Sequence, residues 1–359
     1  NWDEVFLEML PKISQAKNVT DYHLALLETV VKLDDTHANL YTHTLHDFFG
    51  RKTLPVFVDQ VENKLVVTSI LNDTLARQND LRIGDVIETV NGESIAHIIN
   101  KNFRYAHGSN KQVKSRNFDY LLFNGQSDSV ELKIERKGRN YIKTYGRYSD
   151  SLLNRALVTP WINNQSKMLT EDILYLNMEK LKLEGLKKTI PLLKKSKGLI
   201  IDLRNYPRNT TYQLARFFYK EKKPFAKIIA PDLSYPGKFY WKEEQMTNPP
   251  SSKLYFEGKI ILLVNKQTQS RGEYSAMILQ TSDNIITLGS QTAGADGDVS
   301  AIEFVRYRTF ISGLGIYYPN RTPTQRIGIR IDEFVEPTIK GLQEGKDEVL
   351  EIALERLRD

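Results

Sequence analysis

Residues 259–280 have the sequence KIILLVNKQTQSRGEYSAMILQ, in which an apolar run is followed directly by a segment with helical spacing. A buried strand that leads into a helix is the repeating unit of a parallel α/β sheet. Ser270 lies at the junction of the two. Many hydrolases hold a nucleophilic serine on such a turn, with the hydroxyl exposed and backbone N–H groups beside it. The stretch therefore predicts an α/β fold and makes Ser270 a candidate nucleophile.

The same residues also fit a purely structural role. Ser270 and Glu273 match the S-x-x-E pattern of a capping box, in which both side chains satisfy free N–H groups at the start of a helix. A serine in that role has no chemistry to perform. These four residues do not distinguish the two interpretations, so possible partners elsewhere in the chain must decide.

The alternation of strand and helix extends over the second half of the chain. Apolar segments at 172–178, 198–204, 259–265 and 284–290 are separated by amphipathic ones at 183–195, 210–219 and 271–281. Apolar strands between amphipathic helices predict a largely parallel sheet that is buried on both faces. Residues 345–358 predict a final amphipathic helix.

The first part of the chain has a different pattern. Residues 1–48 carry apolar residues at helical spacing, whereas the period changes to two near Leu54. Tight turns are predicted at 62–63, 91–92 and 137–138. We therefore expect a multi-domain α/β protein with a helical N-terminal domain (1–48), a strand-rich domain (49–147) and an α/β core (148–359).

Composition describes an ordinary soluble globular protein of 359 residues, with 40% apolar and 26% charged residues. The net charge of +6 comes from basic residues spread along the chain, and the lysines at 186–197 alternate with apolar positions as on a solvated helix face. Nucleic acid is therefore not an expected partner. The absence of cysteine excludes disulfides, thiolate metal sites and a cysteine nucleophile.

Membrane attachment is not predicted from the residues present. The apolar run at 260–264 is too short to span a bilayer, and no signal-like segment follows Asn1. We interpret the chain as processed or truncated. Membrane association is then expected only through an unseen upstream segment.

A nucleophilic serine needs a base, and His37 is the candidate that stands out among six histidines. It lies just past a predicted helix, where Asp35 and Thr36 could fix the ring. The alternative is a surface histidine that interacts favourably with the helix dipole. His43 and His46 have no third metal ligand at suitable spacing, so neither a metal nor another cofactor is expected.

Four segments taken in order carry a family resemblance: LRIGDVIETVNGESI (81–95), KGLIIDLRNYP (197–207), IILLVNKQTQSRGE (260–273) and LGSQTAGADGDVS (288–300). Together they resemble the carboxyl-terminal processing protease family, which joins a PDZ domain to a crotonase-like or ClpP-like serine protease core. The resemblance implies a serine endopeptidase that acts on unstructured or C-terminal segments of polypeptides. It also implies a PDZ domain at 49–147 and an extracytoplasmic or cell-envelope location in a bacterium.

The resemblance also implies roles for individual residues. One active-site design of the family uses a lysine in the loop after the next strand, and this chain has Ala295 near that position. The other design resembles the tricorn core, in which a hydroxyl residue precedes the histidine base and a late loop supplies a carboxylate. Thr36 and His37 match the first feature, and Gln325 replaces the carboxylate.

The oxyanion site departs from the family pattern. Where the family has two glycines after IDLR, this chain has Arg208 and Asn209. The expected donors are the backbone N–H groups of Arg208 and of Arg271 at the helix start. The lost glycines and carboxylate leave an alternative open, in which a catalytically impaired member binds peptides, for example at a sheet edge of the PDZ-like domain.

Overall fold

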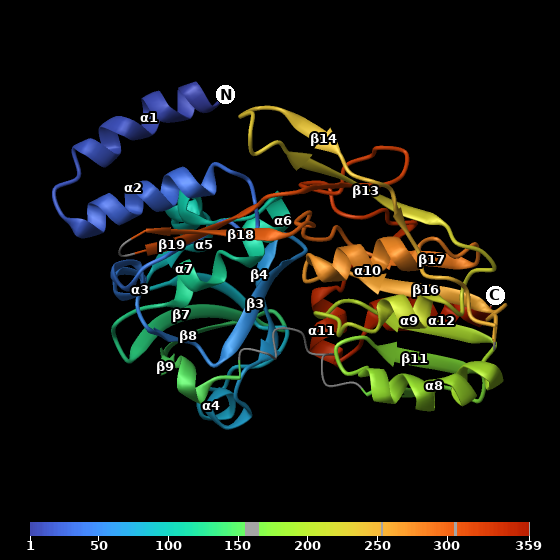
Figure 1. Ribbon diagram of the computed structural model, residues 1–359. Coiled ribbons are helices and arrows are strands. Elements are labelled where there is room, and N and C mark those ends of the chain that lie inside the picture. The colour runs from blue at the N-terminus through green and yellow to red at the C-terminus, as the bar shows by residue number, and fades with distance from the viewer. Residues whose placement is uncertain (155–164, 253, 305–306, 359) are drawn as a thin grey trace. The chain divides into compact units, whose positions relative to one another are not determined.

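The computed structural model describes residues 1–154, 165–252, 254–304 and 307–358 (Figure 1). Its contacts divide the chain into two compact units. The first unit comprises Asn1–Pro160, Ser300–Ile311 and Thr338–Lys346, and the second comprises Trp161–Val299, Ser312–Pro337 and Asp347–Asp359. The finer domain boundaries that the sequence suggests at 48 and 147 stay predictions.

The first unit begins with helices. Its helical elements are α1 (Trp2–Ser14), α2 (Val19–Val31), α3 (His43–Phe49), α4 (Asp73–Gln78), α5 (Ile95–Asn102), η1 (Phe103–Tyr105), α6 (Lys111–Arg116), α7 (Asp119–Phe123), η2 (Asp150–Leu152) and α11 (Ile339–Glu344). Leu27 and Val31 of α2 are buried with Leu40, Leu45 and Tyr105 in one small core. Helix α2 is therefore packed through apolar contacts, whereas the ion pairs Lys12–Glu28 and Lys32–Glu8 connect α1 to α2.

An antiparallel sheet forms the centre of the first unit. Its strand order is β3-β4-β5-β7-β8, and a short strand β6 pairs with β5. These strands are β3 (Val56–Val61), β4 (Lys64–Ile70), β5 (Val86–Val90), β6 (Glu93–Ser94), β7 (Ser129–Arg136) and β8 (Arg139–Gly146). The predicted turns at 62–63, 91–92 and 137–138 all have positive φ, as a two-residue hairpin turn requires. The structure confirms these turns.

Two smaller sheets complete the first unit. Strands β2 (Lys52–Thr53) and β9 (Tyr148–Ser149) pair with each other. The other sheet has the order β1-β19-β18 and contains β1 (Leu40–Tyr41), β18 (Val299–Phe304) and β19 (Tyr307–Ser312). A late part of the chain thus returns to the segment that follows α2.

The second unit is built on a sheet of order β10-β11-β12-β16-β17-β21. Its strands are β10 (Lys167–Met168), β11 (Ile173–Asn177), β12 (Gly198–Asp202), β16 (Lys259–Val264), β17 (Ile285–Gly289) and β21 (Glu333–Phe334). All neighbours from β11 to β21 are parallel, and only β10 is antiparallel. This confirms the parallel sheet that the apolar segments predict.

Helices cover both faces of this sheet (Figure 1). One apolar core contains side chains of α8 (Leu183–Lys195), α9 (Thr211–Ala215) and α10 (Arg271–Leu279), and the other contains side chains of α12 (Glu348–Arg358). Successive residues of β12 alternate between the two cores. Burial on both faces is why these strands have continuous apolar sequences.

A further sheet in the second unit was not predicted from the sequence. Strand β13 (Pro224–Pro231) pairs with β14 (Phe239–Trp241), β15 (Gln245–Met246) and β20 (Gly315–Tyr317).

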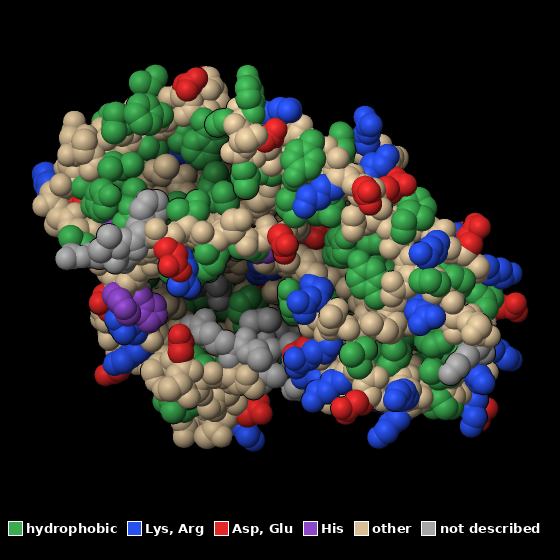
Figure 2. Space-filling view, in the orientation of Figure 1, with side chains coloured by type: hydrophobic (Ala, Val, Ile, Leu, Met, Phe, Trp, Pro, Cys, Tyr) green, Lys and Arg blue, Asp and Glu red, His purple; other side chains and the backbone are tan. Residues whose placement is uncertain are grey.

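No helix within the described ranges is long and apolar enough to cross a membrane. On the face in view, Lys and Arg side chains are spread among acidic and neutral ones over the second unit (Figure 2).

A buried ion network joins the end of β12 to α12. The Arg204 side chain donates to Asp202 at 2.7 Å and to both oxygens of Asp347 at 2.7 and 2.8 Å. Arg204 and Asp202 are almost fully buried. Asp347 also accepts a hydrogen bond from the Leu350 N–H at 3.2 Å, at the start of α12. The network therefore fixes the loop after β12, which runs toward the start of α10.

We expect Asp347→Ala to lower the free energy of unfolding by about 3 kcal/mol, because it leaves a buried guanidinium short of one partner. Asp283→Ala is the matched control, since the ion pair of Asp283 with Lys223 is exposed and should contribute less than about 1 kcal/mol. Urea unfolding of both variants measures the difference. Equal losses would show that the network does not stabilise the fold.

Candidate active site

Ser270 is held in an unusual backbone conformation at the start of α10. Its φ is 53° and its ψ is −116°. These are the angles of the first central residue of a type II′ turn, a position that glycine dominates because a Cβ atom is crowded there. Holding serine in this region costs about 1–3 kcal/mol, and such strain is found at functional sites.

Ordinary capping residues of this chain behave differently. The N-caps of α2, α3, α4, α5, α6 and α11 have extended backbones, and each side chain accepts a hydrogen bond from the first turn of its helix; they are Asn18, Thr42, Asn72, Ser94, Asn110 and Thr338. At Ser270 the backbone N–H donates to Glu273 at 3.3 Å and the two residues form a capping box, but the backbone of Ser270 is not extended as it is at the other caps. Capping alone does not explain this serine.

Glu273 is the fully buried anchor of the site. Its carboxylate accepts hydrogen bonds from the Thr292 hydroxyl (2.6 Å), from the N–H groups of Gly294 (2.7 Å) and Ala295 (2.9 Å), and from the N–H of Ser270. Burial raises the pKa of Glu273, while these donors oppose the rise. The carboxylate therefore holds the loop after β17 against the first turn of α10.

A second loop packs against the first. The N–H of Arg326 donates to Gly294 O at 2.7 Å, and the N–H of Ile329 donates to the Thr292 hydroxyl at 3.0 Å. Gly294 has a φ of 62°, and a Cβ there would lie 2.8 Å from the backbone of Arg326, so only glycine fits. The turn at Ser270 and the loops at 291–297 and 324–329 thus form one site in the second unit.

Gln325 belongs to this second loop and is bonded to the backbone. Its Oε1 accepts from the N–H of Ile316 at 3.2 Å, and its Nε2 donates to Leu314 O at 2.7 Å. An amide oxygen has two lone pairs, so one remains for another donor. The orienting role of Gln325 stays a prediction, and the clear role of its side chain is to hold the segment before β20.

The backbone N–H of Arg208 is already occupied. It donates to Met178 O at 2.9 Å, so in this structure it cannot also stabilise an oxyanion. This corrects the donor expected from the sequence, because the acceptor comes from the end of a neighbouring strand and leaves no local signal. The next residue, Asn209, is exposed and is the better candidate in this loop.

The loop after β12 lies against the start of α10. A Cβ on Gly272 would be 3.7 Å from Pro207, and the Arg271 guanidinium lies 5.5 Å from the centre of the Tyr206 ring. Arg271 is the first residue of α10, where an N–H has no acceptor within the helix and the dipole favours an anion. Its N–H is therefore suited to the oxyanion role that the sequence predicts.

His37 lies in the first unit, in the turn after α2. Its N–H donates to Asp35 at 2.9 Å, and its Nδ1 lies 3.7 Å from the same oxygen. Burial lowers the pKa of His37, and the nearby Asp35 carboxylate partly offsets this. The imidazole is thus neutral at neutral pH, as a base must be. Its pairing with Ser270 of the second unit stays a prediction.

Thr36 is buried and makes a reciprocal pair with Ser109. The Thr36 hydroxyl donates to the Ser109 hydroxyl at 2.9 Å, and the Ser109 N–H donates to the Thr36 hydroxyl at 2.9 Å. This pair anchors the His37 segment to the loop after η1. Sequence reasoning missed Ser109, because its partner is 73 residues away.

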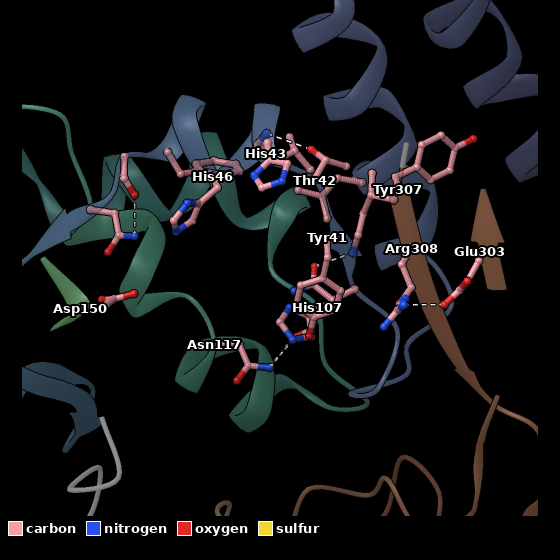
Figure 3. Close-up of a pocket in the computed structure, with 17 residues that line it drawn as sticks. Tyr41, Thr42, His43, His46, His107, Asn117, Asp150, Glu303, Tyr307 and Arg308 are labelled. Carbon is pink, nitrogen blue, oxygen red and sulfur yellow. Dashed lines mark hydrogen bonds and ion pairs between the residues drawn. The ribbon is translucent and has the colours of Figure 1, made fainter. Parts of the chain in front are cut away.

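A cavity of about 800 Å³ lies in the first unit, next to the His37 segment (Figure 3). Asn39, two residues after His37, lines the cavity, and His43 and His46 project from α3 beside it. His107, a histidine to which sequence reasoning gave no role, is held by Asn117 at 3.2 Å, and burial lowers the pKa of its imidazole to about 4. In the described parts of the chain no cluster of three or more acidic or histidine side chains could hold a metal ion.

A strained serine between a parallel strand and a helix, next to the Arg271 N–H at the helix start, resembles the arrangement in which α/β-type hydrolases hold a nucleophile. Residues 172–340 match the model of peptidase family S41. The chain therefore carries an S41 peptidase domain and is a peptidase, as the resemblance of its motifs predicts.

Solved structures confirm the predicted fold. A serine-to-alanine mutant of CPAF matches with a TM-score of 0.77 at 12% identity, over 98% of this chain and 91% of that chain. Mature CPAF complexed with lactacystin matches at 0.74 and 12% identity, over 98% and 92%. A candidate peptidase from Parabacteroides merdae matches at 0.59 and 14% identity, over 99% and 89%. A search of curated proteins finds no match.

Ser270→Gly should raise the free energy of unfolding by about 1 kcal/mol, because glycine adopts this conformation without strain. Ser270→Ala should lower it by at most about 1 kcal/mol, the usual loss of a cap. Ser94→Ala is the matched control, since Ser94 is an ordinary N-cap of α5 and its loss should cost about 1 kcal/mol. Chemical denaturation measures all three. If both Ser270 variants lose as much stability as Ser94→Ala, Ser270 is a cap.

Proposed function

We propose that the protein is a serine endopeptidase in which Ser270 is the nucleophile and His37 the general base. The single observation that carries the proposal is the strained, glycine-like backbone of Ser270 at the start of α10. A capping serine gains nothing from such strain, whereas a nucleophile gains an exposed hydroxyl beside free N–H groups.

The reaction then follows the ordinary course of acyl transfer. Ser270 Oγ forms a bond to the peptide carbonyl carbon as His37 takes the hydroxyl proton, and the carbonyl oxygen becomes an oxyanion. His37 returns the proton to the leaving amine as the C–N bond breaks. A water molecule then attacks the acyl-enzyme, and the same imidazole accepts its proton. No cofactor takes part.

Oxyanion stabilisation is assigned to backbone groups. The Arg271 N–H lies where the dipole of α10 favours negative charge, and the Asn209 N–H is proposed in place of that of Arg208. Thr36, with Ser109, holds the His37 segment, and Gln325 is proposed to accept a hydrogen bond near the base. Because Gln325 carries no charge, it gives an imidazolium less stabilisation than a carboxylate would.

The proposed substrate is an unstructured polypeptide segment. The cavity beside His37 offers apolar walls from Leu27, Leu40 and Leu45, and amide groups from Asn39 and Asn124 that can bond an extended backbone. The antiparallel sheet is the proposed PDZ-like module, and within the described residues its strand β8 has only β7 as a neighbour. An extracytoplasmic or cell-envelope location is proposed from the motif resemblance.

A second candidate function is peptide binding without hydrolysis. Two observations favour it: the Arg208 N–H is occupied by Met178, and Gln325 stands where the family has a carboxylate. The cavity and the sheet edge would then be the working parts of the protein. Activity measurements separate the two functions.

Ser270→Ala should abolish hydrolysis of an unstructured, fluorogenic polypeptide and labelling by a fluorophosphonate probe. His37→Ala should lower kcat/KM by at least about 10³-fold, since residues that act as one unit fail together. His97→Ala, an exposed histidine of α5, is the control and should keep wild-type activity.

Two results would contradict this assignment. Wild-type protein that the fluorophosphonate probe does not label and that hydrolyses no peptide after prolonged incubation would support the peptide-binding function. Unchanged activity in His37→Ala would show that His37 is not the base, but it would leave the assignment of Ser270 as the nucleophile intact.

The acid limb of kcat/KM should have its midpoint below about pH 6.5, the ordinary pKa of histidine, because burial lowers the pKa of His37. Asp35→Asn removes a charge that raises this pKa, so the limb should move to still lower pH. Asp34→Asn is the control, because the Asp34 carboxylate pairs with Lys114 instead. A limb that moves upward in Asp35→Asn would show that His37 is not the titrating base.

A further inference from the structure

Asp296 is a buried carboxyl group that the peptidase mechanism does not use. It follows Ala295 in the loop after β17, and its side chain is 2% exposed. Its Oδ1 accepts the N–H of Gly297 at 2.9 Å, whereas its Oδ2 is buried and has no hydrogen-bond partner among the described residues. A buried oxygen without a donor is costly if the group is ionised.

Within the described residues, Asp296 pairs with no cation. The carboxylate of Glu273 acts on it from the first turn of α10. Tyr274 of α10 and Tyr318, which follows β20, both sense its charge, and each has a raised pKa. Arg330, near Tyr318, is exposed and pairs with Asp332.

We propose, on the basis of the peptidase function above, that Glu273 and Asp296 form a buried carboxyl pair in which Asp296 holds a proton, and that this proton regulates the site by pH. With the proton on Asp296, the pair carries a single negative charge and the loop at 291–297 stays bonded to the start of α10. When Asp296 ionises, two negative charges lie in the interior near the same loop, and the loop separates from the helix start.

The hydrogen bonds decide which group keeps the proton. The four donors to Glu273 come from Ser270, Thr292, Gly294 and Ala295, and they favour its charged form. Asp296 has one donor. Burial raises the pKa of both carboxyls, and the negative charge of Glu273 raises the pKa of Asp296 further, so Glu273 ionises first.

The link to catalysis runs through Glu273. The same carboxylate that would be repelled by ionised Asp296 accepts the N–H of Ser270 and the N–H groups of the loop. A shift of this anchor moves the nucleophile and the helix-start N–H groups together. Asp296 is therefore a positioning residue, and its protonation keeps the site assembled.

The direction of the pH dependence follows from the raised pKa. A carboxyl whose pKa is higher in the folded than in the unfolded state stabilises the fold most below its unfolded pKa, near 4, and this contribution is lost as the pH rises through the folded pKa. The protein should therefore become less stable and less active on the alkaline side. Ionised surface carboxylates do not produce this loss.

The test compares Asp296→Asn with Asp298→Asn over a range of pH. Asparagine keeps the shape and the bond to Gly297 but cannot ionise, so the alkaline decrease of the melting temperature should disappear in Asp296→Asn. Asp298 is exposed in the same loop, so Asp298→Asn should behave as wild type. The kcat of Asp296→Asn should likewise remain constant at alkaline pH where wild-type kcat falls at least about tenfold, the scale of a misplaced reacting group.

The melting curves need no enzymatic activity, so the two proposals can fail separately. An alkaline loss of stability that Asp296→Asn abolishes supports the carboxyl pair even if no variant hydrolyses peptides. Identical pH dependence of melting in wild type, Asp296→Asn and Asp298→Asn overturns the pair even if Ser270 is the nucleophile.

A measurement on the wild-type protein covers the case in which Asp296→Asn does not fold. The infrared spectrum at neutral pH should contain the C=O band of a protonated carboxyl, which surface carboxylates lack, and the band should vanish as the pH rises with the loss of stability. Absence of that band at neutral pH overturns the proposal.

Discussion

The buried carboxylate of Glu273 is the interaction on which the site depends. It accepts four hydrogen bonds that hold the loop at 291–297 against the start of α10, and the loop at 324–329 bonds in turn to this first loop. A fully buried carboxylate is retained only where donors replace water. The sequence places Glu273 in a capping box, but its main contacts are with a loop about 20 residues away rather than with the helix it begins.

Elements fixed by neighbouring residues could be predicted from the sequence. The turn at Asn91-Gly92 requires positive φ, and both residue types tolerate it, so the pattern is local. The parallel strands are buried on both faces, which leaves continuous apolar runs such as residues 260–264. Strand β13 was missed because it is half-exposed and has proline at both ends, so neither apolar continuity nor alternation marks it.

The site was predicted less completely, because its contacts are distant in sequence. Ser270 could be recognised from the strand before it and the helix after it. The occupied N–H of Arg208 could not, since its acceptor is Met178 at the end of another strand. Asp296 lies beside Ala295, where the family design has a lysine, yet only the fold shows that its carboxyl is buried and that the charge of Glu273 acts on it. Partners brought together by the fold leave no pattern in the residues around them.

The conformation of Ser270 also bears on how this sequence evolves. A residue that destabilises its own fold is kept only while selection acts on what it does, and neutral drift would otherwise replace serine by the glycine that its φ of 53° prefers. On the proposed assignment of Ser270 as the nucleophile, the identity of this one residue in other members of the family is a record of which lineages have kept their chemistry and which have retained only the scaffold.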